Sequence, residues 1–438
     1  MGQLQAGIAT VDITPPVGTW LAGFAGRHKG SEGIHDPLRA RALVLDDGDT
    51  RLLIITCDIL SLAYPFIDDL KARIEAESGL PPERVMVNCS HTHSGPVTRT
   101  PAADPSEGDC YMLNLPLTLL GAVKMALADL RPSRIGSART DVQIGINRRE
   151  RIPGGTKLGR NPDLPVAPYV DVVRIDDMAG NPRAILFSHA CHPVTRASDN
   201  YQISADFPGR AQEVVESVFP GVQAMFAQGC AGNINSEPCG GSFEDVHRLG
   251  TVLGGAVIKA AAGIETQCET RLAAAMTPTV LPLQEAPPVD VARERLEAAN
   301  RAVEEAEASG DPGRVKSARS FADWNQRVYD LAKSGATNRV MRYDMQAFAL
   351  GEVGIVGLPG EVFVEYQLNI AARSPFAQTL VFGVTNGCPS YIPTAAEYPH
   401  GGYEVLDAIR FYGDTMIDPG LEPIILDAAH ELLVTVSA

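Results

Sequence analysis

Short runs of apolar residues alternate along most of the chain with longer stretches in which apolar residues recur every three or four positions. The first pattern is typical of buried β-strands and the second of amphipathic helices. It predicts strands over residues 41–45, 51–57, 84–88, 170–175, 184–189 and 223–228, and helices over 67–77, 115–130, 209–218 and 243–262. Towards the C-terminus it predicts strands over 345–350, 353–356 and 379–384, and helices from Val362 and over 421–434.

Local signals refine these elements. Asn114 is a suitable N-cap for the helix over 115–130, and Pro116 suits its first turn. Two charged helical stretches, 291–308 and 314–333, flank a Gly-Asp-Pro break at 310–312. They predict a helical hairpin over about 289–336, either a lid or a solvated structural insertion. Because strands and helices interleave throughout, we expect a single mixed-sheet α/β domain over residues 1–438 that carries this insertion.

Composition excludes several classes of protein. The chain has 438 residues, of which 45% are apolar and 21% charged, and this content is sufficient to bury a core. Lys and Arg number 37 against 53 Asp and Glu, so the formal net charge is −16. Phosphate neutralisation needs clustered basic residues, so we expect neither nucleic acid nor an anionic membrane surface as a partner. A small-molecule substrate is expected instead, and a homo-oligomer stays open.

Targeting signals and cysteine usage favour a cytoplasmic protein. The N-terminal residues contain no basic start followed by an apolar core, so we predict no secretory leader. No uninterrupted apolar run reaches about 18 residues, so we predict no membrane anchor. The eight cysteines include no CxxC pair, a pattern typical of reduced thiols.

Candidate chemistry lies where predicted strands end. His91 and His93 follow the strand over 84–88, and residues two apart on an extended chain project the same way. His192 follows the strand over 184–189 and precedes a proline, whereas His189 lies on that strand and is expected to be structural. Glu361 lies in a strand-to-helix turn. Core histidines and a helix-terminal acid would give the same pattern. Two histidines and a carboxylate would also make a zinc site with an open position.

A set of separated motifs strengthens the metal hypothesis. They are AGI (6–8), DITP (12–15), IHD (34–36), RARA (39–42), SHTHSGP (90–96), INR (146–148), HPV (192–194), ISAD (203–206), PGE (359–361), SYI (390–392), EY (397–398) and YE (403–404). In this order they resemble the catalytic domain of the neutral/alkaline non-lysosomal ceramidase family. The resemblance covers nearly the whole chain, and the ordered set is far more specific than any one motif.

The resemblance implies a one-zinc hydrolase. Position by position, the family's zinc ligands fall on His91, His192, Glu361 and Tyr391. Positions around the scissile amide fall on His93, Arg148 and Tyr403. A zinc-bound water, with its pKa lowered to about 7, is then the expected nucleophile. His93 would pass its proton to the leaving amine, while Arg148 and a tyrosine hydroxyl hold the oxyanion.

The chain departs from the family at two points. Asn235 stands where ceramidases carry a serine regarded as catalytic, and an amide cannot act as an acyl nucleophile. Either the zinc-bound water attacks while Asn235 positions the substrate, or the neighbouring Ser236 takes the role. Cys230 is a third candidate, although a buried small residue is the simpler interpretation. The chain also ends soon after residue 434, so we expect no counterpart of the family's C-terminal immunoglobulin-like domain.

These observations predict a zinc-dependent amidohydrolase. The acidic charge and low aromatic content (6%) favour a small soluble N-acyl substrate over membrane ceramide. An esterase or lactonase would use the same zinc water, and a true ceramidase is a further alternative. A zinc-binding sensor would need the metal but not the acid–base partners beside it.

Overall fold

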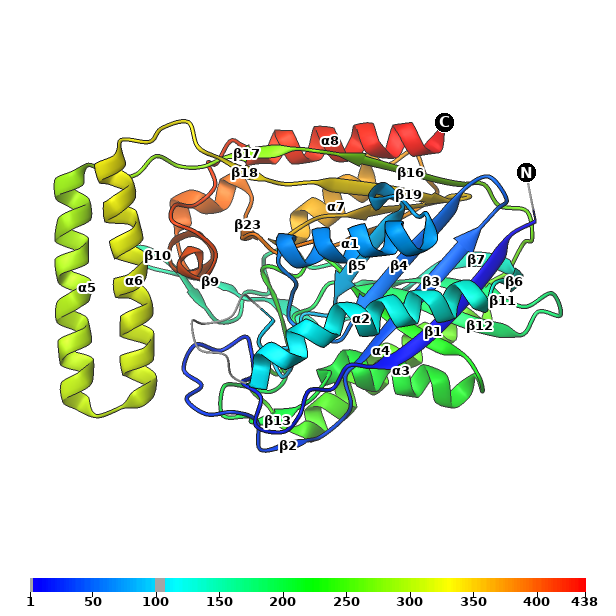
Figure 1. Cartoon of the computed structure of the whole chain (residues 1–438), viewed down its shortest axis with the longest axis horizontal. Coiled ribbons are helices and arrows are strands. Elements are labelled where there is room, and N and C mark those ends of the chain that lie inside the picture. Colours follow the sequence, from blue (N-terminus) through cyan, green and yellow to red (C-terminus); the bar gives the residue numbers. More distant parts are fainter. Residues whose placement is uncertain (1–2, 99–106) are drawn as a thin grey trace.

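The computed structural model describes residues 3–98 and 107–438, and three β-sheets form its centre (Figure 1). The first sheet has the order β5-β4-β3-β1-β6, with β1 Gln5–Asp12, β3 Arg39–Asp46, β4 Arg51–Cys57, β5 Val85–Cys89 and β6 Arg131–Pro132. The second has the order β14-β12-β11-β7, with β7 Arg134–Asp141, β11 Tyr169–Asp176, β12 Pro182–His189 and β14 Gln223–Gln228. The third has the order β16-β19-β20-β22, with β16 Leu272–Thr277, β19 Met345–Leu350, β20 Val353–Gly357 and β22 Gln378–Phe382.

Each sheet is buried on both faces, which explains the continuous apolar runs in its strands. In β4, Leu52 and Ile54 point into a core shared by all three sheets, whereas Leu53 and Ile55 point to the opposite face. Phe348 and Leu350 of β19 reach the same shared core. The outer faces are covered by α1 Tyr64–Ser78 and α2 Glu107–Ala128 on the first sheet, α3 Asp206–Val218 and α4 Phe243–Ala262 on the second, and α7 Val364–Ala372 and α8 Leu421–Ser437 on the third.

The three sheets meet at the carboxyl ends of their parallel strand pairs, which are β4–β5, β12–β14 and β20–β22. Asn88, near the end of β5, joins them. Its side-chain amide donates to the carbonyl of Gly383 (2.7 Å) and that of Gln228 (3.3 Å), and its Oδ1 accepts from the Gln228 amide (2.8 Å). This buried junction fixes the strand ends from which the loops of the functional site depart, as expected for ligand sites in α/β folds.

Shorter elements complete the fold around these ends. The paired short strands are β2 Gly33–Ile34 with β13 Gln202–Ile203, β8 Gly145–Asn147 with β15 Ile234–Ser236, β9 Arg149–Ile152 with β10 Gly155–Leu158, β17 Val280–Pro282 with β18 Val340–Arg342, and β21 Glu361–Val362 with β23 Tyr391–Ile392. Single-turn helices are η1 Pro82–Arg84, η2 Ala395–His400, η3 Tyr403–Asp407 and η4 Ala408–Phe411. Of these η3 is a π-helical turn, a feature frequent at functional sites.

The predicted insertion is a helical hairpin of α5 Val289–Ser309 and α6 Pro312–Ser334 that projects beside the sheets (Figure 1). Gly310 closes α5 in the left-handed region with φ +70°. The Asp311 side chain caps α6 by accepting from the amides of Gly313 and Arg314, and Pro312 occupies its first turn. The break read from the sequence is therefore the hairpin turn.

The mixed α/β architecture is confirmed, and α4, β4, β14 and β19 have the predicted bounds. The prediction for the helix over 115–130 is wrong at its start. The described part of α2 begins at Glu107, so Asn114 and Pro116 lie inside the helix. The proline removes one internal hydrogen bond there without ending the helix. The sequence patterns also missed β1 and β7, the latter because its residues are only partly buried.

One segment of the described residues, Cys110–Ala128 of α2, is long and apolar enough to cross a membrane by length and composition, with a mean hydropathy of 1.4. This segment also supplies core residues, among them Leu115, Leu119 and Val123, that pack against the first sheet. Core helices of this kind pass the same test. The expectation of no membrane anchor stays a prediction.

Candidate metal centre

His91 is held in place by the loop that follows β4. Its backbone lies in the left-handed region with φ +68°, which is unfavourable for a side chain of this size and marks a constrained position. The His91 amide donates to the carbonyl of Ile59 (3.0 Å), and its ring Nδ1 lies 2.8 Å from the carbonyl of Leu60. Because a carbonyl only accepts, Nδ1 carries the proton and Nε2 presents a lone pair to the site.

His192 is positioned in the same way after β12. Its amide donates to the carbonyl of Ile234 (3.0 Å), and its Nδ1 lies 2.6 Å from the carbonyl of Ala231. The second ring nitrogen, Nε2, therefore also presents a lone pair in the neutral ring. Fixing the tautomer through a backbone carbonyl is the usual arrangement for a metal-binding histidine.

Glu361 reaches the two imidazoles from β21, which follows strand β20 of the third sheet. Gly360 before it has φ +88°, and a Cβ there would lie 2.5 Å from the carbonyl of Ser390, so only glycine fits. The Glu361 Oε2 atom lies 3.0 Å from Nε2 of His192 and 3.2 Å from Nε2 of His91. Its Oε1 accepts a hydrogen bond from the Tyr412 hydroxyl.

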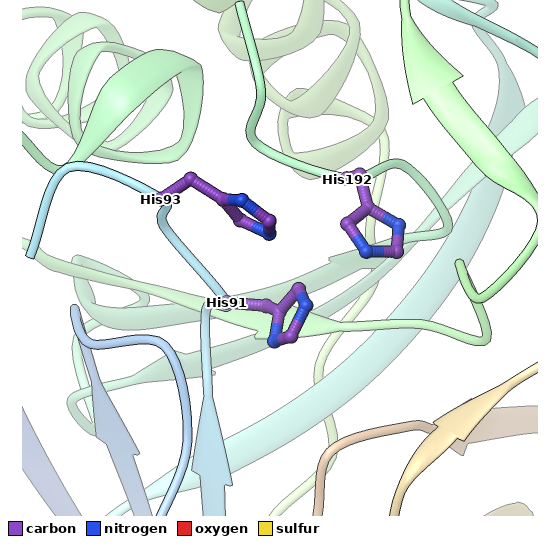
Figure 2. Close-up of side chains that lie close together, drawn as sticks. All are labelled: His91, His93 and His192. Carbon is purple, nitrogen blue, oxygen red and sulfur yellow. The ribbon is translucent and has the colours of Figure 1, made fainter. Parts of the chain in front are cut away.

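His93 completes a group of three imidazoles whose rings converge (Figure 2). One nitrogen of each ring, on His91, His93 and His192, lies within 4.8 Å of the others. Both ring nitrogens of His93, and Nε2 of His91, are buried without a hydrogen-bond partner. Gly23 makes room for this ring, since a Cβ there would lie 2.4 Å from Nδ1 of His93.

This donor set fits a divalent metal ion. Lone pairs of two imidazoles and a carboxylate oxygen meet within 3.0–3.2 Å, and with both Nδ1 atoms protonated no hydrogen is left between them. Acceptors that face one another in a buried site repel unless a cation or a proton lies among them. Histidine nitrogens with a carboxylate are the ligands of catalytic zinc sites.

The pKa values of His93 and His192 agree with neutral imidazoles in the buried site. Burial lowers the pKa of His192 to about 4, and Arg148 adds to this effect. Burial and the neighbouring imidazoles hold the pKa of His93 well below its ordinary value. For Glu361, burial alone would raise the pKa, and a cation held between the carboxylate and the imidazoles would lower it.

Arg148 organises the side of the site opposite the imidazoles. Its guanidinium donates from Nε to Glu404 (2.7 Å), from Nη1 to Oδ1 of Asn235 (3.1 Å) and from Nη2 to the hydroxyl of Tyr391 (3.0 Å). Burial alone would lower the pKa of Arg148, but Tyr391 and Glu404 raise it, so the group stays charged. Arg148 thus fixes the orientation of both an amide and a phenol, and two of its five N–H groups remain for a ligand.

The two predicted tyrosines lie together. Tyr391 pairs with Glu361 in the parallel β21–β23 ladder, which places the predicted ligands side by side. Burial raises the pKa of Tyr391 well above its ordinary value, although Arg148 opposes this rise. The ring of Tyr403, on the π-helical turn η3, lies 5.8 Å from that of Tyr391, and burial raises its pKa to about 12. Both phenols line the same cavity.

The geometry separates the three candidates that replace the family serine. Asn235, paired through β15 with β8, lines the cavity and accepts from Arg148. The Ser236 hydroxyl donates to the carbonyl of Pro238 (3.1 Å), and no general base contacts it in the described part of the chain. Cys230 is fully buried, and burial raises its thiol pKa, so it is no nucleophile.

A cavity of about 1160 Å³ opens onto His91, His93 and Glu361. Volumes of about 300–1,000 Å³ are ordinary for small-molecule sites, so this one is large. Much of its wall is apolar, and includes Leu21, Phe24, Leu60, Val97, Ile146 and Val194.

Several residues of the site escaped prediction. Arg149 and Glu404 form a buried pair (2.6 Å), and Glu397 binds the same guanidinium (2.6 Å). Glu404 and Glu397 each lie in a quoted motif, so the motifs contained the signal, and Arg149 directly follows another. Tyr412 and Asn88 follow no pattern that a single sequence displays, because their roles depend on contacts between distant segments.

Comparisons with known proteins agree with the geometry. The family model described as "Neutral/alkaline non-lysosomal ceramidase, N-terminal" matches residues 4–338. Neutral ceramidase A of Dictyostelium discoideum is 27% identical over 269 residues, or 55% of this chain and 37% of that protein. Neutral ceramidase of Drosophila pseudoobscura pseudoobscura is 24% identical over 262 residues, or 52% and 35%. The matched regions thus span little more than a third of either relative.

A solved structure shows the same fold. The neutral ceramidase from Pseudomonas aeruginosa aligns with a TM-score of 0.75 and 19% identity over 100% of this chain and 75% of its own. Glu361, Tyr391 and Tyr403 lie beyond the residues that the family model matches, so their roles depend on the geometry described above. The family model covers most of the described fold, and the chain belongs to the neutral/alkaline non-lysosomal ceramidase family.

Proposed function

We propose that this protein is a zinc-dependent hydrolase that cleaves the amide bond of an N-acyl compound. The observation that carries the proposal is the convergence of imidazole nitrogens, those of His91 and His93 without a hydrogen-bond partner, and a carboxylate on the wall of a large apolar cavity. Membership of the ceramidase family supports an amide bond as the target. The single ion would be held by His91, His192, Glu361 and Tyr391.

A zinc ion bound there supplies Lewis acidity and lowers the pKa of a coordinated water to about 7. The protein's own groups do the remaining work. Glu361 brings the negative charge that offsets the cation, and Tyr412 fixes its second oxygen. Both ring nitrogens of His93 are buried without a hydrogen-bond partner, so a neutral ring there can accept a proton and return it to the leaving amine nitrogen. Arg148 and Tyr403 donate to the amide oxygen as negative charge develops on it.

Asn235 takes a positioning role in this scheme. Its Oδ1 accepts from Arg148, so its amide group is held in a fixed orientation at the cavity wall. An amide in that place donates to the substrate but does not attack it. A water activated by a bound metal ion would then be the nucleophile, and no acyl-enzyme would be formed on Asn235.

The cavity supports an N-acyl substrate with a long chain. A volume of about 1160 Å³ with apolar walls accepts an alkyl chain of a kind that ceramide carries, so a true ceramidase fits at least as well as a hydrolase of small soluble substrates. The small-substrate preference, the cytoplasmic location and the exclusion of nucleic acid stay predictions.

Metal analysis and a substrate panel test the proposal. Purified protein should carry one zinc per chain by inductively coupled plasma mass spectrometry. It should hydrolyse N-acyl amides, including short-chain ceramide, and lose activity in chelator. Faster turnover of p-nitrophenyl esters or lactones would favour the esterase alternative, and bound zinc without turnover would favour a sensor. Zinc-free protein, or a His91→Ala variant with intact hydrolysis, would overturn the proposal.

His93 has two potential roles that one variant separates. If His93 carries protons, the variant His93→Gln should keep its zinc, and kcat should fall about a hundredfold to ten-thousandfold. If His93 is a third imidazole ligand of the metal, the same variant should lose zinc and activity in proportion. Zinc content and kcat measured on one preparation therefore assign the residue, and retention of both would exclude it from the site.

A further inference from the structure

The cavity wall carries the opposite charge to the rest of the protein. The whole chain has 53 acidic and 37 basic residues. The charged side chains that line the cavity are mainly basic, namely Arg148, Arg160, Arg248, Lys316 and Arg410 against Glu237 and Glu361. A charged ligand inside the cavity interacts with these nearby groups more strongly than with the screened surface. The excess of positive charge on the cavity wall therefore favours an anionic ligand.

Most of these cations are already paired. Arg148 pairs with Glu404 at 2.7 Å, Arg248 with Asp245 at 3.1 Å, and Arg160 with Glu237. Within residues 3–98 and 107–438, no carboxylate forms an ion pair with Lys316 or Arg410. Asp407 attracts Arg410 through space without forming such a pair. Lys316 and Arg410 are thus the cations of the wall whose charge is least compensated.

Arg410 is held rigidly for a ligand. The central carbon of its guanidinium lies 3.9 Å from the ring centroid of Phe321 on α6 and 4.2 Å from that of Phe411. Nη1 donates to the carbonyl of Asp407 (2.7 Å), and Nε is buried without a hydrogen-bond partner. Contacts with two rings restrict the guanidinium, and its planar fork of donors suits the recognition of an oxyanion.

Lys316 approaches from the hairpin. Its Nζ donates to the carbonyl of Arg27 (2.8 Å) and lies 4.7 Å from the ring centroid of Trp20. An ammonium has three N–H donors, so this contact leaves donors for a ligand. Lys316 and Arg410 also line a groove of about 710 Å³ along the hairpin, so they mark the boundary between that groove and the catalytic cavity.

We propose that the substrate is an N-acyl amphiphile with an oxyanion group, and that Lys316 and Arg410 bind this group at the cavity mouth. The apolar wall takes the acyl chain, and the scissile amide lies between chain and anion, beside the imidazoles. This inference rests on the proposed amide hydrolysis and adds the charge class of the substrate. Ceramide is neutral and would leave both cations without a partner.

Binding to zinc-free protein tests the inference without turnover. Chelator-treated protein is titrated calorimetrically with N-lauroylglycine, N-lauroyl-γ-aminobutyrate and N-lauroyl-6-aminohexanoate, each against its neutral carboxamide. At least one anion should bind about tenfold tighter than its carboxamide, and this difference should disappear in Arg410→Gln and in Lys316→Gln. Lys333→Gln is the matched control, because Lys333 lies on the same helix, exposed and outside the cavity wall.

Turnover by the zinc-loaded enzyme gives the second measurement. The ratio of kcat/KM for the anion to kcat/KM for its carboxamide should fall about tenfold in Arg410→Gln and in Lys316→Gln, and should decrease as salt rises. Equal binding of anions and carboxamides, or equal losses for both in the variants, overturns the inference while amide hydrolysis stands. Absence of hydrolysis for every N-acyl compound overturns the proposed function. The calorimetric comparison of anions with carboxamides then still shows whether the cavity prefers an anionic ligand.

Discussion

The strand-end metal centre and the α5–α6 hairpin both reach the same cavity, but they are built in opposite ways. His91, His192 and Glu361 are at most 4% exposed, and each is positioned by backbone groups of a different sheet or loop. The two hairpin helices contribute few buried residues, namely Ala292, Ala306, Asn325 and Val328. The hairpin is joined to the body by separate contacts such as the bond from Trp324 to the carbonyl of Asp414 (2.7 Å).

The difference shows where the molecule tolerates change. Arg149 is a buried charge that pairs with Glu397 and Glu404. Loss of one partner of such a buried pair lowers the free energy of unfolding by about 3–5 kcal/mol. Exposed pairs such as Arg319–Glu307 on the hairpin contribute about 0–1 kcal/mol. The buried strand-end loops are therefore expected to tolerate fewer substitutions than the hairpin.

The largest effect is expected at His192. His192→Ala removes one of the imidazoles expected to bind zinc, so zinc should be lost and kcat/KM should fall about a thousandfold or more. His189→Gln is the control, since His189 is the last residue of β12, shortly before His192, and its ring contacts the carbonyl of Tyr169 instead of the site. Zinc content by mass spectrometry and kcat/KM measure the outcome. Equal losses in both variants would show that general destabilisation, not ligation, is being measured.

A second test addresses the buried ion network. Glu404→Gln removes a carboxylate from both Arg148 and Arg149, so the free energy of unfolding should fall by about 3–5 kcal/mol in urea denaturation. Glu307→Gln makes the same change on the hairpin and should cost less than about 1 kcal/mol. Similar losses for the two variants would remove the contrast between the buried site and the hairpin.

The elements that the sequence predicts correctly are those marked by residues at or next to their own ends. Helix α4 is bounded by a capping box between Ser242 and Asp245, and the hairpin turn by Gly310 and Pro312, so both could be predicted. The arrangement of three sheets could not, because strand pairing depends on residues far apart. Asn88 illustrates this limit, since its partners are 140 and 295 residues away.

The residues of the candidate site also fall into those that local sequence predicts and those that it does not. His91, His93, His192 and Glu361 follow strands, and the motifs around them allowed their prediction. Their convergence required the folded chain, and so did the contact of the Tyr412 hydroxyl with Glu361. The cavity volume was equally inaccessible, because it depends on side chains from loops that no periodicity describes.

The third test uses pH to measure how the buried carboxyl of Asp206, which contacts the chain after His192, affects stability. Asp206 is buried, and its carboxylate accepts from the amides of Phe207 (2.6 Å) and Arg196 (3.3 Å). Burial raises its pKa to about 6, against about 4 in the unfolded chain. The folded state therefore binds more protons between these values, and its stability falls as pH rises through about 6.

Comparison with Asp206→Asn isolates this contribution. From pH 4 to pH 7 the unfolding free energy of the wild type, minus that of the variant, should fall by about 2 to 3 kcal/mol. Urea denaturation of zinc-free protein at each pH gives the difference, and Asp290→Asn on the hairpin, where Asp290 is exposed, should show no such trend. A difference that rises with pH would mean that the ionised carboxylate stabilises the loop.

The smallest effect on stability is expected from removal of the hairpin itself. Strands β17 and β18 pair with Pro282 opposite Val340, and the Leu283 amide donates to the carbonyl of Arg339 (2.9 Å). The chain ends around the insertion are therefore adjacent. Replacing residues 285–337 by Asn-Gly, which favours a two-residue hairpin turn, should keep the ladder intact.

This shortened chain should retain its zinc and unfold within about 1–2 kcal/mol of the full chain, because few hairpin residues pack on the core. It should also lose the preference for anionic over neutral N-acyl compounds, since Lys316 and the Phe321 ring beneath Arg410 are both removed. Zinc content, urea denaturation and the anion-to-carboxamide ratio of kcat/KM are measured together. Loss of zinc would show that the hairpin supports the metal centre, and the two regions would then be a single cooperative unit.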